Sequence, residues 1–208
     1  MTPEETLSQI AAEVNKCTRC ELHHSRKNGV AGEGPVDAEI IFIGESPGFH
    51  ENEQGRPFVG ASGRYFDELL ALCNLKRQSV FLGNVVKCRP PTNRDPQAEE
   101  LTACNFFLDR QIQVIKPRVI VTLGRFSMAK YFPHAKISEI HGQPMRVRGS
   151  LIIPMYNPAA ALHLPSLKST LEADFAKLPE LIASAAEAPE YAAEISDETE
   201  EPQQLSMF

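Results

Sequence analysis

The sequence contains no tryptophan and no long hydrophobic run. Its longest apolar stretches reach five or six residues, whereas a membrane-spanning helix needs roughly 20. Residues 1–5 are polar and partly acidic, unlike the basic start and apolar stretch of a secretion signal. These absences argue against a membrane protein and predict a soluble, cytoplasmic one.

Basic residues are absent from one end of the chain. Residues 180–208 carry eight acidic side chains and no Lys or Arg, which leaves 21 basic and 19 acidic residues in residues 1–179. The formal net charge of −6 therefore comes from this acidic segment. We expect a mildly basic folded body, which permits contact with phosphate groups, and a strongly acidic tail.

Cysteine is scarce, with five in 208 residues. Intracellular thiols are kept reduced, which argues against disulfides. Cys17 and Cys20 form a Cys-x-x-Cys pair, and Cys88 and Cys104 lie far downstream with 15 residues between them. Cys73 falls in an apolar helical run and is predicted to be a buried core thiol.

Four short apolar runs are typical of buried parallel strands. They are residues 40–43, 80–82, 119–123 and 151–153, and helical patterns occupy residues 2–14, 62–73, 97–115, 126–131 and 166–178. This alternation predicts a three-layer α/β/α sandwich around a four-stranded, mainly parallel sheet in residues 1–179. The composition then shifts to Ala, Glu, Ser and Pro, so residues 180–208 are predicted to be a tail, disordered over residues 183–202.

Polar or glycine-rich segments follow all four predicted strands. They begin with Gly44-Glu45, Gly83-Asn84, Gly124-Arg125 and Tyr156-Asn157. Ligands of open α/β sheets bind beyond the carboxyl ends of the strands, which predicts a site at this edge. The alternative is that glycine and proline only terminate strands here.

Three segments resemble motifs of the family 4 uracil-DNA glycosylases, the family that contains an iron–sulphur cluster. Residues 44–48 and 55–60, Gly-Glu-Ser-Pro-Gly and Gly-Arg-Pro-Phe-Val-Gly, are similar to its first motif. Residues 83–94 resemble its central segment and residues 156–162 its last motif. With the cysteines, the resemblance covers residues 17–178. It implies a base-flipping, nucleoid-associated repair enzyme that hydrolyses uracil from DNA, leaves an abasic site and acts as a monomer.

The resemblance implies a uracil pocket built from Gly44, Phe58 and Asn84. Phe58 matches the family's stacking aromatic, and Asn84 matches the amide that reads the edge of the base. An amide suits that role because it offers both a donor and an acceptor. From the residues alone, Phe58 is better explained as a core residue and Asn84 as a turn former.

The group that positions the attacking water is less sharply defined. Ser46 stands where related families have an aspartate. The resemblance therefore implies that the attacking water is positioned by other groups, for which Glu45, Glu51 and Asn93 are the candidates. A carboxylate also stabilises positive charge that develops on a sugar. Glu45 and Glu51 are equal candidates, and a solvated loop charge is the plainer interpretation of Glu51.

Asn157 departs from the family pattern, which has histidine at this position as a donor to the departing uracil. An asparagine amide also donates, and removal of one such donor typically costs about 10²–10³ in rate. Asn157 is therefore predicted to be a catalytic residue, and uracil excision by the protein is predicted to be slow. A uracil-binding or abasic-DNA-binding module with weak catalysis is the alternative function. A metal-dependent nucleotide hydrolase on the same sheet is a further rival, without a ligand cluster or phosphate loop to support it.

Contacts with DNA are predicted at Gly124 and in the loop after the last motif. Leu162 and Leu164 are candidates for a wedge that enters the gap left by the flipped base. The alternative is that both leucines pack down onto the sheet.

The family implies a [4Fe–4S] cluster on Cys17, Cys20, Cys88 and Cys104. Four thiolates are what such a cluster requires. Their spacing also allows a structural zinc, although zinc sites usually combine two close pairs.

Residues 204–208 resemble the short peptide with which bacterial repair proteins bind the sliding clamp. Gln204, Leu205 and Phe208 are the predicted contacts. They end an acidic segment with little else to bury.

Overall fold

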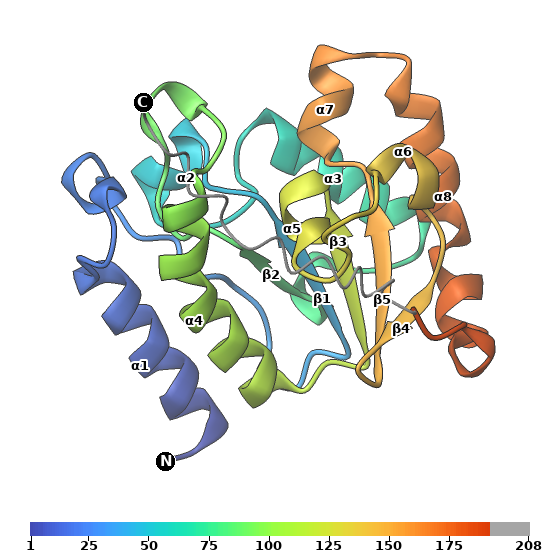
Figure 1. Ribbon diagram of the computed structural model, residues 1–208, viewed down its shortest axis with the longest axis horizontal. Coiled ribbons are helices and arrows are strands. Elements are labelled where there is room, and N and C mark those ends of the chain that lie inside the picture. Colours follow the sequence, from blue (N-terminus) through green and yellow to red (C-terminus); the bar gives the residue numbers. More distant parts are fainter. Residues whose placement is uncertain (192–208) are drawn as a thin grey trace, which may run out of the picture.

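The computed structural model describes residues 1–191 and places a twisted sheet at the centre of the fold (Figure 1). Its strands are β1 (Ile40–Gly44), β2 (Phe81–Asn84), β3 (Val119–Leu123), β4 (Met145–Val147) and β5 (Ser150–Met155), in the order β2-β1-β3-β5-β4. All neighbouring pairs are parallel except β4 with β5. The mainly parallel sheet is confirmed, but the expected count of four strands was wrong. The edge strand β4 has only three half-buried residues and therefore leaves no apolar run in the sequence.

Eight α-helices connect or flank the strands of the described chain. They are α1 (Pro3–Lys16), α2 (Phe49–Gln54), α3 (Ala61–Leu72), α4 (Ala98–Ile115), α5 (Arg125–Ala129), α6 (Ile137–Ile140), α7 (Pro158–His163) and α8 (Leu167–Ala183). The first helix begins as its sequence predicts. Thr2 accepts a hydrogen bond from the Glu5 amide at 3.2 Å, and the Glu5 carboxylate accepts one from the Thr2 amide at 2.8 Å.

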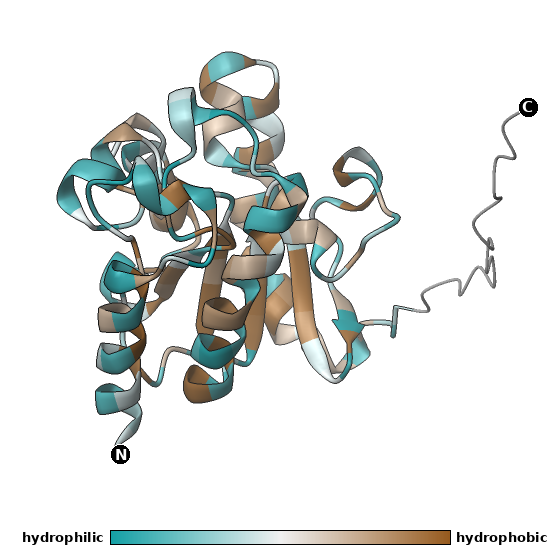
Figure 2. Cartoon of the chain, turned by 60° about the vertical axis from the view of Figure 1, so that its left-hand side comes forward, coloured by the Kyte–Doolittle hydropathy of each residue, from teal (hydrophilic) through white to brown (hydrophobic). Residues whose placement is uncertain are grey.

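Helices cover both faces of the sheet, which confirms the three-layer sandwich. Side chains alternate along each strand, so Phe42 packs with α3 and α8 on one face, while its neighbours Ile41 and Ile43 pack with α4 on the other. Figure 2 shows the resulting hydrophobic strands between more polar outer helix surfaces. Helix α1 forms an additional outer element, packing Ile10 and Val14 against Phe107 of α4. No helix within residues 1–191 combines the length and apolar character needed to cross a membrane.

The packed body continues past residue 179, where we expected it to end. Helix α8 runs to Ala183, and the short helix Ala185–Glu187 follows it. Ala185 is buried, and the Tyr191 ring lies 4.8 Å from the Phe132 ring. The expected disorder is therefore wrong for residues 183–191, because small alanines pack where larger apolar side chains would normally signal burial. Gln204, Leu205 and Phe208 lie outside the described residues.

Candidate active site and cysteine cavity

A cleft of about 450 Å³ opens at the carboxyl ends of the strands. Its wall brings together eight of the residues predicted from the sequence: Gly44, Glu45, Glu51, Phe58, Asn84, Asn93, Asn157 and Leu162. Gly124 and Leu164 lie outside the wall of this cleft. The glycine-rich strand ends are therefore more than strand terminators.

Asn84 and Phe58 meet above Gly44 at the base of the cleft. Gly44 and Asn84 are paired at the ends of β1 and β2. A Cβ atom on Gly44 would lie 2.4 Å from the Asn84 Oδ1 atom and 2.8 Å from the Phe58 ring. Glycine is needed at this position because any side chain would collide with both the Asn84 amide and the Phe58 ring. Phe58 and Asn84 are both buried, so the sequence-based alternatives of a core residue and a turn former describe their packing but not their position at the cleft.

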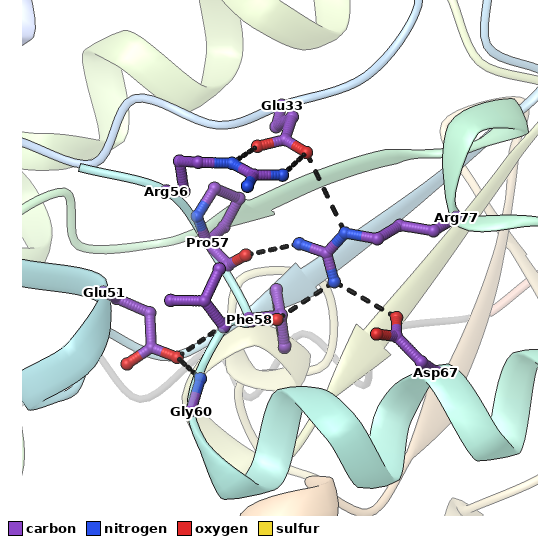
Figure 3. A network of polar contacts seen from close by, with 9 residues as sticks. Glu33, Glu51, Arg56, Pro57, Phe58, Gly60, Asp67 and Arg77 are labelled. Carbon is purple, nitrogen blue, oxygen red and sulfur yellow. Dashed lines mark hydrogen bonds and ion pairs between the residues drawn. The ribbon is translucent and has the colours of Figure 1, made fainter. Parts of the chain in front are cut away.

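The Phe58 loop is fixed through its amides by Glu51, which projects from α2 (Figure 3). The Glu51 Oε1 atom accepts hydrogen bonds from the amides of Val59 at 2.9 Å and Gly60 at 2.8 Å. Its Oε2 atom accepts one from the Gly48 amide at 3.1 Å. Glu51 is only 7% exposed, so it is a buried partner of the backbone and not a solvated loop charge.

Arg77 holds the same loop through its carbonyl groups (Figure 3). Its guanidinium donates to the Pro57 carbonyl at 2.5 Å and to the Phe58 carbonyl at 3.0 Å. Asp67 and Glu33 lie 3.2 and 3.8 Å from Arg77 and orient it. Phe58 adopts a φ of 52°, a left-handed conformation that is rare outside glycine and asparagine. The four backbone bonds from Glu51 and Arg77 to residues 57–60 hold it there.

Arg77 and Glu33 were missed by the sequence analysis. Both lie outside the recognised motifs, and they act on the backbone or on charged side chains, so their residue types carry no signal of a pocket. Arg56 also pairs with Glu33, at 2.7 Å. This hydrogen bond holds the pKa of the Glu33 carboxyl below its usual range.

Glu45 presents a free carboxylate to the cleft. It is half-buried, and burial raises its pKa, with a further contribution from the negative charge of Asp95 and an opposing one from Arg125. Arg125 itself pairs with Asp95. Glu45 thus differs from Glu51, whose two oxygens are both engaged by amides.

Asn157 caps the first turn of α7. Its Oδ1 atom accepts a hydrogen bond from the Ala159 amide at 2.9 Å, which leaves the NH₂ group of the side chain for other partners. Gly124 adopts a φ of 92°, and a Cβ atom there would lie 3.1 Å from the Asn157 Cβ atom. Glycine at position 124 therefore lets the Asn157 side chain pack closely against the backbone there.

Asn93 is exposed at the rim of the cleft and also adopts a positive φ, 56°. Its Oδ1 atom accepts a hydrogen bond from the Arg89 Nε atom at 2.7 Å. On the α7 side, Leu162 and Leu164 are 49% and 54% exposed. The alternative in which the leucines pack down onto the sheet is therefore wrong.

Phe49, His50 and His163 also line the cleft and were not predicted. Phe49 had the clearest available signal, since it is the one apolar side chain in the polar run of residues 48–54.

The four cysteines predicted as ligands line one small cavity between α1, α4 and the segment after β2: Cys17, Cys20, Cys88 and Cys104. Cys73 lies elsewhere, buried as predicted, with its thiol donating to the Leu70 carbonyl at 3.2 Å. Burial raises the pKa of Cys20 and Cys88, and that of Cys104 to about 11. A thiolate in this cavity thus requires compensation by positive charge or by hydrogen-bond donors.

Donors to sulphur are present around the cavity. The Lys87 amide donates to the Cys104 sulphur at 3.3 Å, and the Arg26 guanidinium donates to the Cys88 sulphur at 3.4 Å. Within residues 1–191, no three His, Cys, Asp or Glu side chains gather closely enough to hold a single metal ion.

Comparison with known proteins places these features in one family. Residues 31–178 match the family profile described as "Uracil DNA glycosylase superfamily". The chain is 46% identical to a type-4 uracil-DNA glycosylase of Sulfurisphaera tokodaii, over 85% of each chain. It is 42% identical to one of Archaeoglobus fulgidus, over 85% of this chain and 94% of the relative. A type-5 uracil-DNA glycosylase of Pyrobaculum aerophilum is 28% identical over 61% of this chain.

Proposed function

Since this chain belongs to the uracil DNA glycosylase superfamily, and within it to the type-4 enzymes, we propose that its cleft binds flipped-out uracil and cleaves the bond between base and deoxyribose. The chain is a uracil-DNA glycosylase, a hydrolytic enzyme that acts on uracil-containing DNA, and the binding-module alternative is not favoured. The close approach of Asn84 and Phe58 at Gly44, on the wall of the cleft, is the observation that carries the assignment of roles.

In the proposed complex the uracil ring enters the cleft beside these two side chains. Phe58 stacks on its face, and the Asn84 amide pairs with its Watson–Crick edge. The ring position is reproducible because the loop that carries Phe58 is held through both its amides and its carbonyls. Asn157 directs its free NH₂ group to the uracil oxygen that gains negative charge as the bond breaks.

Glu45 is the proposed water-positioning base. A water oxygen forms a bond to the sugar carbon C1′ while the bond from C1′ to uracil N1 breaks and its electron pair leaves with uracil. The water proton passes to the Glu45 carboxylate, and the uracil anion is later protonated from solvent. The raised pKa of Glu45 suits a base that works near neutral pH. Asn93 sits at the rim, where its free NH₂ group can orient the water or the sugar.

The proposal is tested with an oligonucleotide containing one uracil, followed by alkaline cleavage of abasic sites. Glu45→Gln should lower single-turnover excision about 10²–10⁴-fold while leaving affinity for DNA nearly unchanged. Glu139→Gln, on α6 and outside the cleft wall, is the matched control. Full activity of Glu45→Gln would remove Glu45 from the mechanism. Equal cleavage of uracil and thymine strands by the wild-type protein would contradict the assignment of the pocket.

A [4Fe–4S] cluster bound by Cys17, Cys20, Cys88 and Cys104 is the proposed cofactor. Its support is the shared cavity and the donors to sulphur. When bound, such a group ties the N-terminal segment to the region after β2 and to α4. The residues of the cleft perform the hydrolysis without it.

The cofactor proposal predicts a yellow-brown protein with about four irons per chain, as the four-thiolate ligand set implies. Cys88→Ala should remove the visible absorbance and the iron, whereas Cys73→Ala should retain both. A colourless protein with one zinc would contradict the cluster.

Two further contacts belong to this proposal. Leu162 enters the base stack at the flipped nucleotide, with Gly124 and Leu164 nearby on the DNA-facing side.

Gln204, Leu205 and Phe208 bind the sliding clamp of a bacterial replication system. The clamp so holds the enzyme, acting as a monomer, at nucleoid DNA. Deletion of residues 204–208 should leave excision on short oligonucleotides unchanged and abolish clamp binding in calorimetry. Clamp binding that survives the deletion would rule these residues out.

A further inference from the structure

Phe49 is an exposed aromatic residue at the mouth of the cleft. It is the first residue of α2 and lines the cleft, yet 53% of it is exposed. None of the roles assigned above uses it. Ligand-binding clefts are lined predominantly by hydrophobic and aromatic side chains, so an aromatic ring on the wall of this cleft is placed to contact the ligand.

Arg89 and His50 pack against the Phe49 ring. The Arg89 guanidinium lies over the ring, 5.3 Å from its centroid, and the His50 ring meets it edge-on at 5.5 Å. Arg89 is itself fixed, because its Nε atom donates to Asn93. One face of the Phe49 ring is thus covered by a cation, and the exposed remainder is free to stack.

The cleft is larger than a single pyrimidine requires. Its volume of about 450 Å³ falls in the range of pockets that enclose drug-sized ligands. Two exposed apolar side chains, Phe49 on α2 and Leu162 on α7, line it. A strand that delivers uracil to Asn84 must carry its neighbouring nucleotides across this outer part of the cleft.

We propose that Phe49 is a stacking platform for a base that directly neighbours the uracil in the same strand. Arg89, beneath the ring, strengthens the stack and lies close to the strand's phosphates. The platform accepts any base, since every base presents a π face to an aromatic ring. This inference rests on the proposed function of the cleft.

Removal of the ring should weaken substrate binding. Phe49→Ala should raise KM for a single-stranded uracil oligonucleotide about 5- to 150-fold, the range expected for loss of one base–aromatic stack. The change should appear mainly as a higher KM, with kcat little altered. The reason is that a stack made equally in the bound and transition states stabilises both states by the same amount. Phe49→Trp should restore a low KM.

The chain contains no tryptophan, so Phe49→Trp also introduces a single tryptophan, whose emission can be excited apart from that of the four tyrosines. Its emission should change on titration with the uracil strand. Phe106→Trp is the matched control, because Phe106 is 44% exposed and also lies beside arginines, Arg19 at 4.4 Å and Arg110 at 5.0 Å, but belongs to α4 and not to the cleft wall. Its emission should stay constant in the same titration.

The decisive experiment removes the neighbouring base instead of the side chain. Oligonucleotides carry a stable abasic residue immediately 5′ or immediately 3′ of the uracil. For the wild-type protein, one of these positions should raise KM as much as Phe49→Ala does, and the variant should lose nothing further on that substrate. Wild-type KM values that are unchanged by both abasic positions, or an equal additional loss in the variant, would overturn the proposal. Failure of the proposed function is distinguishable, since the wild-type protein would then excise no uracil from the unmodified strand.

Discussion

The two walls of the cleft are built in different ways. The wall that carries Phe58 is tied down by hydrogen bonds from Glu51 and Arg77 to the backbone of residues 57–60. The wall formed by α7 has one side-chain cap, from Asn157, and presents the exposed Leu162. The difference separates two tasks. In the proposed complex, the fixed wall would recognise the flat base and the less constrained α7 wall would contact the DNA strand.

Loss of Glu51 should break the fixed wall. Glu51→Ala leaves the amides of Gly48, Val59 and Gly60 without their acceptor, at a cost of about 1–3 kcal/mol each. The summed cost of about 3–9 kcal/mol should lower the melting temperature by at least roughly 6 °C, and excision should fall by about 10²-fold or more as Phe58 loses its position. Glu53→Ala, on the same helix, removes only an ion pair with Lys27 and should shift melting by a few degrees at most. Equal effects of both substitutions would show that Glu51 does not hold the wall.

Asn157 belongs to the α7 wall and is the proposed donor to the departing uracil. Asn157→His should accelerate excision by up to about 10²-fold, because an imidazole reaches further toward the uracil oxygen. The same change removes a helix cap and should lower stability by about 1 kcal/mol. Single-turnover rates and thermal melting check the two effects separately. A variant no faster than the wild type would mean that the asparagine amide already donates fully.

Arg77→Gln should loosen the fixed wall without dismantling it. Two carbonyl groups lose a charged donor, so we expect KM for uracil DNA to rise about 10-fold as the Phe58 stack weakens. Arg77→Lys should recover part of this loss. Arg56→Gln is the control, because Arg56 pairs with the same Glu33 but touches neither carbonyl. If the control raises KM equally, the charge on Glu33 and not the loop is the sensitive feature.

Leu162→Ala should affect excision from double-stranded DNA more than excision from single-stranded DNA, which tests the role of the α7 wall. Excision from double-stranded DNA should fall about 3- to 10-fold, because a wedge offsets the cost of an unstacked step. Single-stranded DNA has no partner strand to hold apart and should be cleaved at nearly the wild-type rate. Equal losses on both substrates would argue for simple packing of Leu162 against the cleft.

The smallest expected effect concerns the pH dependence set by Glu45. Burial raises the pKa of this carboxyl first, and the charge of Asp95 raises it further. If the ionised form is required, the rate falls as the pH drops through this raised pKa. Asp95→Asn should therefore move the acid limb of the single-turnover rate to lower pH. Asp109→Asn, away from the cleft wall, should leave it in place. A shift to higher pH in Asp95→Asn would contradict the role of Glu45.

Most of the fold follows from the sequence because the buried strands leave uninterrupted apolar runs. The same logic failed at β4, whose three residues are only half-buried, and at residues 183–191, where Ala185 packs without an apolar run to signal its burial. The elements that position the cleft were found, and those at the far edge and the end of α8 were not.

The site divides along a similar line. Residues whose side chains face a ligand carry a recognisable type, so Asn84, Phe58 and Asn157 were predicted and are brought together. Residues that act on the backbone carry no such signal. Arg77 was missed for this reason, and Glu51 was taken for a water-positioning group or a loop charge although it binds three amides. Backbone conformation, such as the positive φ of Phe58, is not written in residue types.

The packing of α1 against α4 sets an order of events during synthesis. The apolar face of α1 packs on Ala31 and on Phe107 of α4, and Glu13 pairs with Arg110, so α1 cannot complete its packing before α4 is made. A ribosome that adds about 5–20 residues per second needs roughly 4–17 seconds to advance from Cys20 to Cys104. Throughout that interval the Cys-x-x-Cys pair exists without the wall that later encloses it. The helix that emerges early in translation is thus among the last to dock, and any chaperone or cofactor-delivery protein would meet these two thiols while they are still open to solvent.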